Sequence, residues 1–329
     1  MSPNIQPRMS KSRMSYIDKL KALAMLLVIM GHTIYFCMYH EKPTNDPVLN
    51  IICTFHVPLF FFLSGFVIKQ PPVGLKLLHK VRRFMIPMLV VGFLNALLIG
   101  KVSDFFLTSG HNGYWYLLTL TIFYLLLSLF LINRLKKRIY SFLIDVIMAG
   151  LLWLVLIKVF KLFNQPCDPF NLGSLYSFWP YFIAGYLIRK FGFEKFIIDK
   201  PWLTVILLFC YLMLLLAYYS HLNEPSIYMQ YAIAFTAIAA LLALFHHFEE
   251  SHTFFDRQLS FIGNNTLDIY VYHYFFIRFI SLDFLKSQSL IVELLVTISL
   301  TILIAYGSMG IGHLVQRGLS LITNRNHIN

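Results

Sequence analysis

Charged residues are scarce in this 329-residue chain. Asp, Glu, Lys and Arg make up 13% of it, whereas apolar residues make up 58% and the mean hydropathy is +0.68. A soluble protein of this length needs more charge to cover its surface, and long uncharged apolar runs are typical of membrane proteins. No polar stretch approaches the length of a soluble domain. The composition therefore favours a membrane protein without a separate soluble domain.

Repeats and metal-binding motifs are also lacking. The sequence has no Gly-x-y repeat, no Pro-rich linker and no long block of like charge. Its four cysteines, Cys37, Cys53, Cys167 and Cys210, show no CxxC spacing, so we expect small buried hydrophobes, with a disulfide between Cys37 and Cys53 left open. Metal binding needs a closer His, Asp and Glu constellation than the sequence offers, so no metal is expected.

What the chain does have is a series of long apolar windows. Windows of about 20 apolar residues, the length that crosses a bilayer as a helix, predict an all-α, multi-span membrane helical bundle of about ten transmembrane helices. The predicted spans are 21–39, 48–68, 84–100, 114–133, 141–160, 173–190, 201–219, 227–246, 264–284 and 289–313. The domain organisation follows as an N-terminal segment 1–20, a membrane domain 21–313 and a tail 314–329.

The distribution of positive charge predicts the orientation. With the N-terminus inside, 21 of the 27 Lys and Arg residues fall in inner segments and 6 in outer ones. Basic residues gather in the cytoplasmic loops of membrane proteins. We therefore expect both termini in the cytoplasm, and the net charge of +12 reports topology rather than a nucleic-acid partner.

Three histidines lie deep in predicted spans. His32 and His56 fall at similar depth from the outer side, and His273 lies near the middle of the ninth span. Ionisable groups in hydrocarbon are costly unless they face a cavity or a partner. Neutral imidazole accepts a proton near pH 7 and so suits a general base. Each histidine also has a plainer reading as a polar group that holds helices together.

Basic residues mark the inner end of the same spans. Lys21 precedes His32 by eleven residues, which on a helix places the two on one face about 16 Å apart. Lys80 and Arg83 are spaced i, i+3 just before the third span. Such residues are ordinary interface anchors, but they also fit the phosphates of a cytoplasmic ligand.

Aromatic residues cluster at the start of the fourth span, in the stretch HNGYWYLL. An aromatic belt at the membrane surface is the common explanation. Sugar rings also stack on aromatic faces, so Trp115 and Tyr116 are candidates for an acceptor platform.

Four segments together resemble the acyltransferase-3 family of bacterial membrane acyltransferases, in particular its sugar O-acetylase branch. They are YIDKLKALAMLLVIMGH, FHVPLFFFLSGF, KVRRFMIP and GNNTLDIYVYH, and they occur in the family's order across nearly the whole chain. The first contains the family's basic residue, ten residues, then histidine. Lysine stands at 21 and 80, where the family often has arginine, and lysine keeps the charge but loses bidentate phosphate geometry.

The resemblance implies an O-acetyltransferase in the bacterial inner membrane. Acetyl-CoA would approach from the cytoplasm and a hydroxyl of an extracytoplasmic or lipid-linked sugar from outside. His32 would be the catalytic base, Lys21, Lys80 and Arg83 would bind the donor, and His56, Trp115, Tyr116 and His273 would line the substrate cavity. Acyl-CoA, a glycan acceptor and membrane lipid are the implied partners.

Two other functions remain open on the sequence. A transporter or flippase would move a glycan or lipid along a polar path lined by the same histidines, although inverted repeats of the kind that many transporters carry are not visible. A non-catalytic membrane subunit that binds a lipid or a partner is the third. Only the enzyme would release CoA from acetyl-CoA in the presence of an acceptor.

Overall fold

The computed structural model describes residues 14–39, 46–133, 137–163, 167–198, 200–220, 226–249 and 253–325. Most of the predicted segment 1–20 and the end of the predicted tail 314–329 lie outside these ranges. Regular structure within them is helical throughout. The longer helices are α1 (Ser15–His32), α2 (Pro47–Phe66), α3 (Leu75–Pro87), α6 (Trp115–Ser128), α7 (Arg138–Phe163), α8 (Leu172–Phe191), α10 (Pro201–Ser220), α11 (Ile227–His247), α12 (Phe254–Asn264), α13 (Thr266–Ile277) and α14 (Leu290–Arg325).

Short helical segments join these helices or extend them. They are the π-helices η1 (Thr33–Tyr39) and η2 (Met88–Gly92), the short α-helices α4 (Phe93–Leu98), α5 (Val102–Leu107) and α9 (Glu194–Ile198), and the 3-10 helices η3 (His111–Gly113), η4 (Leu129–Ile132) and η5 (Asp283–Ser287). The prediction of an all-α multi-span bundle is confirmed.

Seven helical stretches of the described residues are long and apolar enough to cross a membrane. They are Ser15–Tyr39, Pro47–Phe66, Leu75–Leu98, Arg138–Phe163, Pro201–Ser220, Ile227–His247 and Leu290–Gly318. The predicted spans 114–133 and 173–190 are also helical, but the first is a shorter apolar helix, Trp115–Leu131, and the second carries Pro180, Arg189 and Lys190. The count of ten therefore stays a prediction.

The ninth predicted span, 264–284, differs most from the structure. Its helix α13 covers 12 residues and ends at Ile277, and the short helix η5 follows at Asp283. At about 1.5 Å per residue, α13 is only about 18 Å long and cannot cross the hydrocarbon core on its own. The predicted boundary at residue 313 also lies within a helix, because α14 continues to Arg325.

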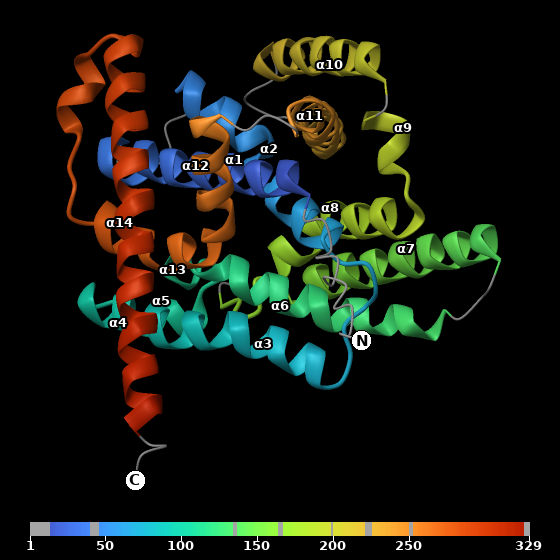
Figure 1. The fold of residues 1–329 in the computed structure, drawn as a ribbon, viewed down its shortest axis with the longest axis horizontal. Coiled ribbons are helices and arrows are strands. Elements are labelled where there is room, and N and C mark those ends of the chain that lie inside the picture. The colour runs from blue at the N-terminus through green and yellow to red at the C-terminus, as the bar shows by residue number, and fades with distance from the viewer. Residues whose placement is uncertain are drawn as a thin grey trace, which may run out of the picture.

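Peripheral helices present apolar side chains outward. On α7, Leu151 and Leu154 are more than half exposed, and so are Val205 and Phe209 on α10. Figure 1 shows α10 and α7 at the outer edges of the bundle, while α1 and α2 run through its middle. A helix that is apolar on its solvent side suits contact with lipid chains rather than with water.

Helices α2 and α8 approach each other closely in the core, and glycine makes this possible. A Cβ atom added to Gly65 would collide with the carbonyl oxygen of Phe182, and one added to Gly185 would collide with that of Phe62. Small residues at such crossings let helix backbones come close in membranes. The contact fixes the part of α2 that carries Ser64.

A buried ion pair anchors the beginning of α1. Lys19 is 1% exposed, and its Nζ lies 2.6 Å from Oδ1 of Asp256 on α12 and donates a hydrogen bond of 2.8 Å to the carbonyl of Phe248. Breaking one partner of such a pair costs about 3–5 kcal/mol. The helix that carries Lys21 and His32 is thus held in register at its N-terminal end.

Candidate active site

A cavity of about 250 Å³ lies between α1, α2, α3, α6 and α13. We call it the His32 cavity. Seven of the eight residues singled out from the sequence line it, and the eighth, His273, does not. Those that do are Lys21, His32, His56, Lys80, Arg83, Trp115 and Tyr116. Residues more than 90 positions apart in the chain therefore meet around one space.

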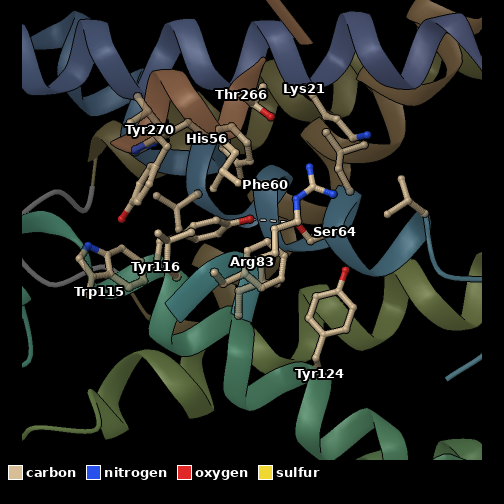
Figure 2. Close-up of a pocket in the computed structure, with 18 of the residues that line it drawn as sticks. Lys21, His56, Phe60, Ser64, Arg83, Trp115, Tyr116, Tyr124, Thr266 and Tyr270 are labelled. Carbon is tan, nitrogen blue, oxygen red and sulfur yellow. Dashed lines mark hydrogen bonds between the residues drawn. The ribbon is translucent and has the colours of Figure 1, made fainter. Parts of the chain in front are cut away.

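The basic residues lie at one end of this cavity. In Figure 2, Lys21 and Arg83 are at one side, and His56, Tyr270 and Trp115 are at the other. Lys21 and His32 share the unbroken helix α1, so about 16 Å separates them along its axis. A ligand that reaches from one to the other must be extended.

Two of the three basic side chains have neighbours that hold them in place. The Nζ atom of Lys21 lies 3.4 Å from Oδ1 of Asp18, one turn earlier on α1. The Nζ atom of Lys80 lies 5.2 Å from the ring centroid of Tyr124, a cation–π distance. Arg83 follows one turn later on α3 and is exposed. Together they bring positive charge to a partly apolar wall, an arrangement that suits phosphate groups.

His32 and His273 form a hydrogen-bonded pair. Nδ1 of His32 lies 3.0 Å from Nε2 of His273, and the rings are nearly parallel, with 7° between their planes. His273 is 0% exposed and lies behind His32 rather than on the cavity wall. His273 was expected to line the cavity, but it is not among the lining residues.

Backbone carbonyls fix the tautomers of this pair. Nδ1 of His273 lies 2.7 Å from the carbonyl oxygen of Tyr270 and 3.2 Å from that of Ile269. A carbonyl only accepts, so this nitrogen carries the proton and Nε2 of neutral His273 is an acceptor. Nδ1 of His32 must then donate to it. The lone pair of His32 is left on Nε2, which is the arrangement that a general base needs.

The other face of His32 contacts Tyr274, a residue that the sequence reading passed over. The Tyr274 hydroxyl lies 3.3 Å from Nε2 of His32 and can donate to its lone pair. Tyr274 follows His273 directly, so it points about 100° away from it around α13. Its place beside a deep histidine in YVYHYFF was the only signal that could have found it.

His56 brings a second imidazole to the cavity. Its Nδ1 lies 2.7 Å from the carbonyl oxygen of Ile52. By the same argument Nδ1 donates, and the acceptor lone pair of neutral His56 is on Nε2. His56 is half-buried and lines the cavity with His32, so both imidazoles carry their acceptor nitrogen on Nε2.

The aromatic pair is part cavity wall and part core. The hydroxyl of Tyr116 lies 2.9 Å from Oγ of Ser64, a contact drawn in Figure 2. Trp115 stacks on Phe178 with ring centroids 5.6 Å apart. The two side chains therefore have packing roles in addition to lining the cavity, and the hydroxyl of Tyr116 is held in place by Ser64.

Within the described ranges no three His, Cys, Asp or Glu side chains are grouped so as to hold a metal ion. The arrangement offers two chemical functions. The cationic groups suit an anionic ligand, and an imidazole whose Nε2 accepts a hydrogen bond from a hydroxyl suits proton removal from a substrate hydroxyl.

Comparison with known proteins identifies the family. A family model described as "Acyltransferase domain" (Acyl_transf_3) matches residues 14–310. Searches of curated proteins and of solved structures gave no match. The family match covers the helices that build the His32 cavity, from α1 to most of α14. On this evidence the chain is a multi-span membrane protein that belongs to the acyltransferase-3 family.

Proposed function

We propose that the protein transfers an acetyl group from cytoplasmic acetyl-CoA to a hydroxyl of an extracytoplasmic or lipid-linked sugar. One observation carries the proposal: Lys21, Lys80 and Arg83 line the same cavity as His32 and His56, with Lys21 and Arg83 at one side and His56 at the other (Figure 2). The family supplies acyl transfer. The excess of basic residues in the predicted inner segments supports a donor arriving from the cytoplasm, across a bacterial cytoplasmic membrane.

The separation of charge and base fits the shape of the donor. Acetyl-CoA has its phosphates at one end and its thioester at the other, joined by the pantetheine arm. If the phosphates bind near Lys21, Lys80 and Arg83, an extended arm runs along α1 toward His32, about 16 Å away. Binding within the cavity would shield the thioester from water, which limits hydrolysis.

The reaction follows from the tautomer of His32. Its Nε2 accepts the proton of the acceptor hydroxyl while the oxygen attacks the thioester carbonyl carbon. A C–O bond forms, the C–S bond breaks, and the proton passes from His32 to the departing sulfur to give free CoA. His273 acts through His32 by holding Nδ1 as the donor. General base catalysis of this kind contributes about 10²- to 10⁴-fold, and holding both substrates together adds to it.

A donor assay tests the proposal. Purified protein in proteoliposomes is incubated with acetyl-CoA labelled in the acetyl group, with and without octyl glucoside or a surface glycan. We expect free CoA and labelled sugar only with an acceptor present. The rate of folded His32→Ala should be about 10²- to 10⁴-fold lower than that of the wild type. His79 is exposed, and His79→Ala should transfer at the wild-type rate.

Two outcomes would contradict the proposal. If wild-type protein moves the glycan across the bilayer and releases no CoA, the transporter alternative holds. If His32→Ala elutes as a folded protein and transfers acetyl groups at the wild-type rate, His32 is not the base.

A further inference from the structure

A second pocket lies on the far side of His32. It has a volume of about 370 Å³ and is lined by Phe36 of η1, by Tyr274 and Ile277 of α13, and by the residues from Arg278 to Ser281 that follow α13. We call it the Arg278 pocket. Along α1 and α13 it follows the His32 cavity, whose lining ends at His32 and Tyr270.

The two spaces meet at His32 and Tyr274. His32 lines the first and Tyr274 lines the second, and the Tyr274 hydroxyl lies 3.3 Å from Nε2 of His32. The ring of Phe36 packs against both residues, with its centroid 5.7 Å from that of His32 and 6.2 Å from that of Tyr274. The hydroxyl nearest the base thus belongs to a side chain of the second pocket.

Arg278 gives this pocket its charge. Its guanidinium carbon lies 5.8 Å from the ring centroid of Tyr274, so the cation stacks on the residue that touches His32. It is exposed, and the part of the chain that the structure describes shows no ion pair for it within 4.0 Å. A guanidinium offers a fork of donors that matches carboxylate and phosphate oxygens.

We propose that the Arg278 pocket binds the acceptor, and that Arg278 recognises an oxyanion on it, either the phosphate of a lipid-linked sugar or the carboxylate of an acidic sugar. The proposal rests on the function proposed above. The donor fills the His32 cavity from one side, and the acceptor hydroxyl reaches Nε2 of His32 from the other, taking the place that the Tyr274 hydroxyl has here. Arg278 lies toward the outer end of the predicted span 264–284, on the side of the membrane where basic residues are few.

Competing acceptors test the proposal. Acetyl transfer is measured with three probes that share a glucose-derived pyranose ring and an octyl chain: octyl glucoside, which is neutral, octyl glucuronide, in which a carboxylate replaces the C6 hydroxymethyl group, and octyl phosphoryl glucose, which carries a phosphate. We expect wild-type kcat/KM to be higher for one anionic probe than for the neutral one. Which anionic probe is preferred distinguishes the carboxylate source from the phosphate source.

Arg278→Gln should lower the anionic-to-neutral ratio of kcat/KM about tenfold, the value of one charge-assisted hydrogen bond, and Arg278→Lys should restore most of it. Lys286→Gln is the matched control, because Lys286 pairs with Asp283 on the surface and does not line the pocket. All probes are compared on one preparation, so an unfolded fraction lowers every rate equally and leaves the ratio unchanged.

The results separate this proposal from the general one. No transfer to any acceptor by the wild type overturns the proposed function and this inference with it. Transfer without a preference for anionic probes, or a preference that survives in Arg278→Gln, overturns the inference alone and leaves Arg278 as an interface anchor. A preference lost in Arg278→Gln and kept in Lys286→Gln supports it.

Discussion

Nε2 of His273 accepts a hydrogen bond of 3.0 Å from Nδ1 of His32, although the two residues are 241 positions apart. His273 is held by carbonyls of its own helix, and His32 lines the cavity. A histidine that is 0% exposed cannot touch a substrate, so its part in catalysis is to position the base.

Replacing His273 tests this positioning role. In His273→Leu no acceptor remains for Nδ1–H of His32, and the imidazole is free to adopt the other tautomer. We expect kcat to fall on the order of 10- to 100-fold with the KM for acetyl-CoA little changed, because a base in the wrong tautomer loses up to about 10⁴-fold. Steady-state kinetics with octyl glucoside measures both constants.

His273→Gln is the matched variant, because a glutamine oxygen takes the place of Nε2 and accepts the same hydrogen bond. It should recover most of the lost kcat. Equal loss in Leu and Gln variants, or a loss that appears in KM alone, would mean that His273 only packs between α1 and α13.

The donor end is tested by a substrate that lacks phosphates. S-Acetylpantetheine carries the same thioester as acetyl-CoA but none of its phosphates. Lys80→Gln and Arg83→Gln should each lower kcat/KM for acetyl-CoA about tenfold relative to that for S-acetylpantetheine, the value of one charge-assisted hydrogen bond. The measured quantity is the ratio of the two specificity constants.

Arg82→Gln serves as the control on the same helix. Arg82 is exposed and does not line the His32 cavity, so its loss should leave the ratio at the wild-type value. If Arg82, Lys80 and Arg83 variants lower the ratio alike, the effect is the general field of this basic segment. The assignment of specific phosphate contacts to Lys80 and Arg83 would then be wrong.

The sequence predicted those parts of the site that depend on one helix or on depth. Lys21 and His32 share α1, so helix geometry alone placed them on one face, and both line the cavity. His56 was placed by its similar depth in the neighbouring span.

What the sequence could not predict is the rotation of one helix against another. His273 and Tyr274 are successive residues at almost the same depth, and only the packing of α13 against α1 decides which of them touches which nitrogen of His32. A rotation of about 100° exchanges them. The Arg278 pocket could not be predicted for a related reason. Helix α13 ends at Ile277, inside the window 264–284 that was predicted as one continuous span.

A glycine against Tyr274 gives the last test. Gly113 has φ of +101°, a conformation that side chains rarely adopt. A Cβ atom there would overlap the ring and hydroxyl of Tyr274. Because the backbone of Gly113 is held by a hydrogen bond of 2.7 Å from the Tyr270 hydroxyl, the ring of Tyr274 must move instead. That ring contacts His32.

Gly113→Ala should therefore affect stability and acceptor use together. We expect a loss of about 1–3 kcal/mol in the free energy of unfolding from overpacking, measured by thermal denaturation in detergent. kcat/KM for octyl glucoside should fall about tenfold or more, since a displacement of about 1 Å at a reacting group can cost 10²-fold. Gly110→Ala is the control, with φ of −76° and no heavy atom within 4 Å of an added Cβ, and it should resemble wild type. Identical behaviour of the two variants would show that Tyr274 has room to shift without disturbing His32. The position of the Tyr274 ring would then not control the base.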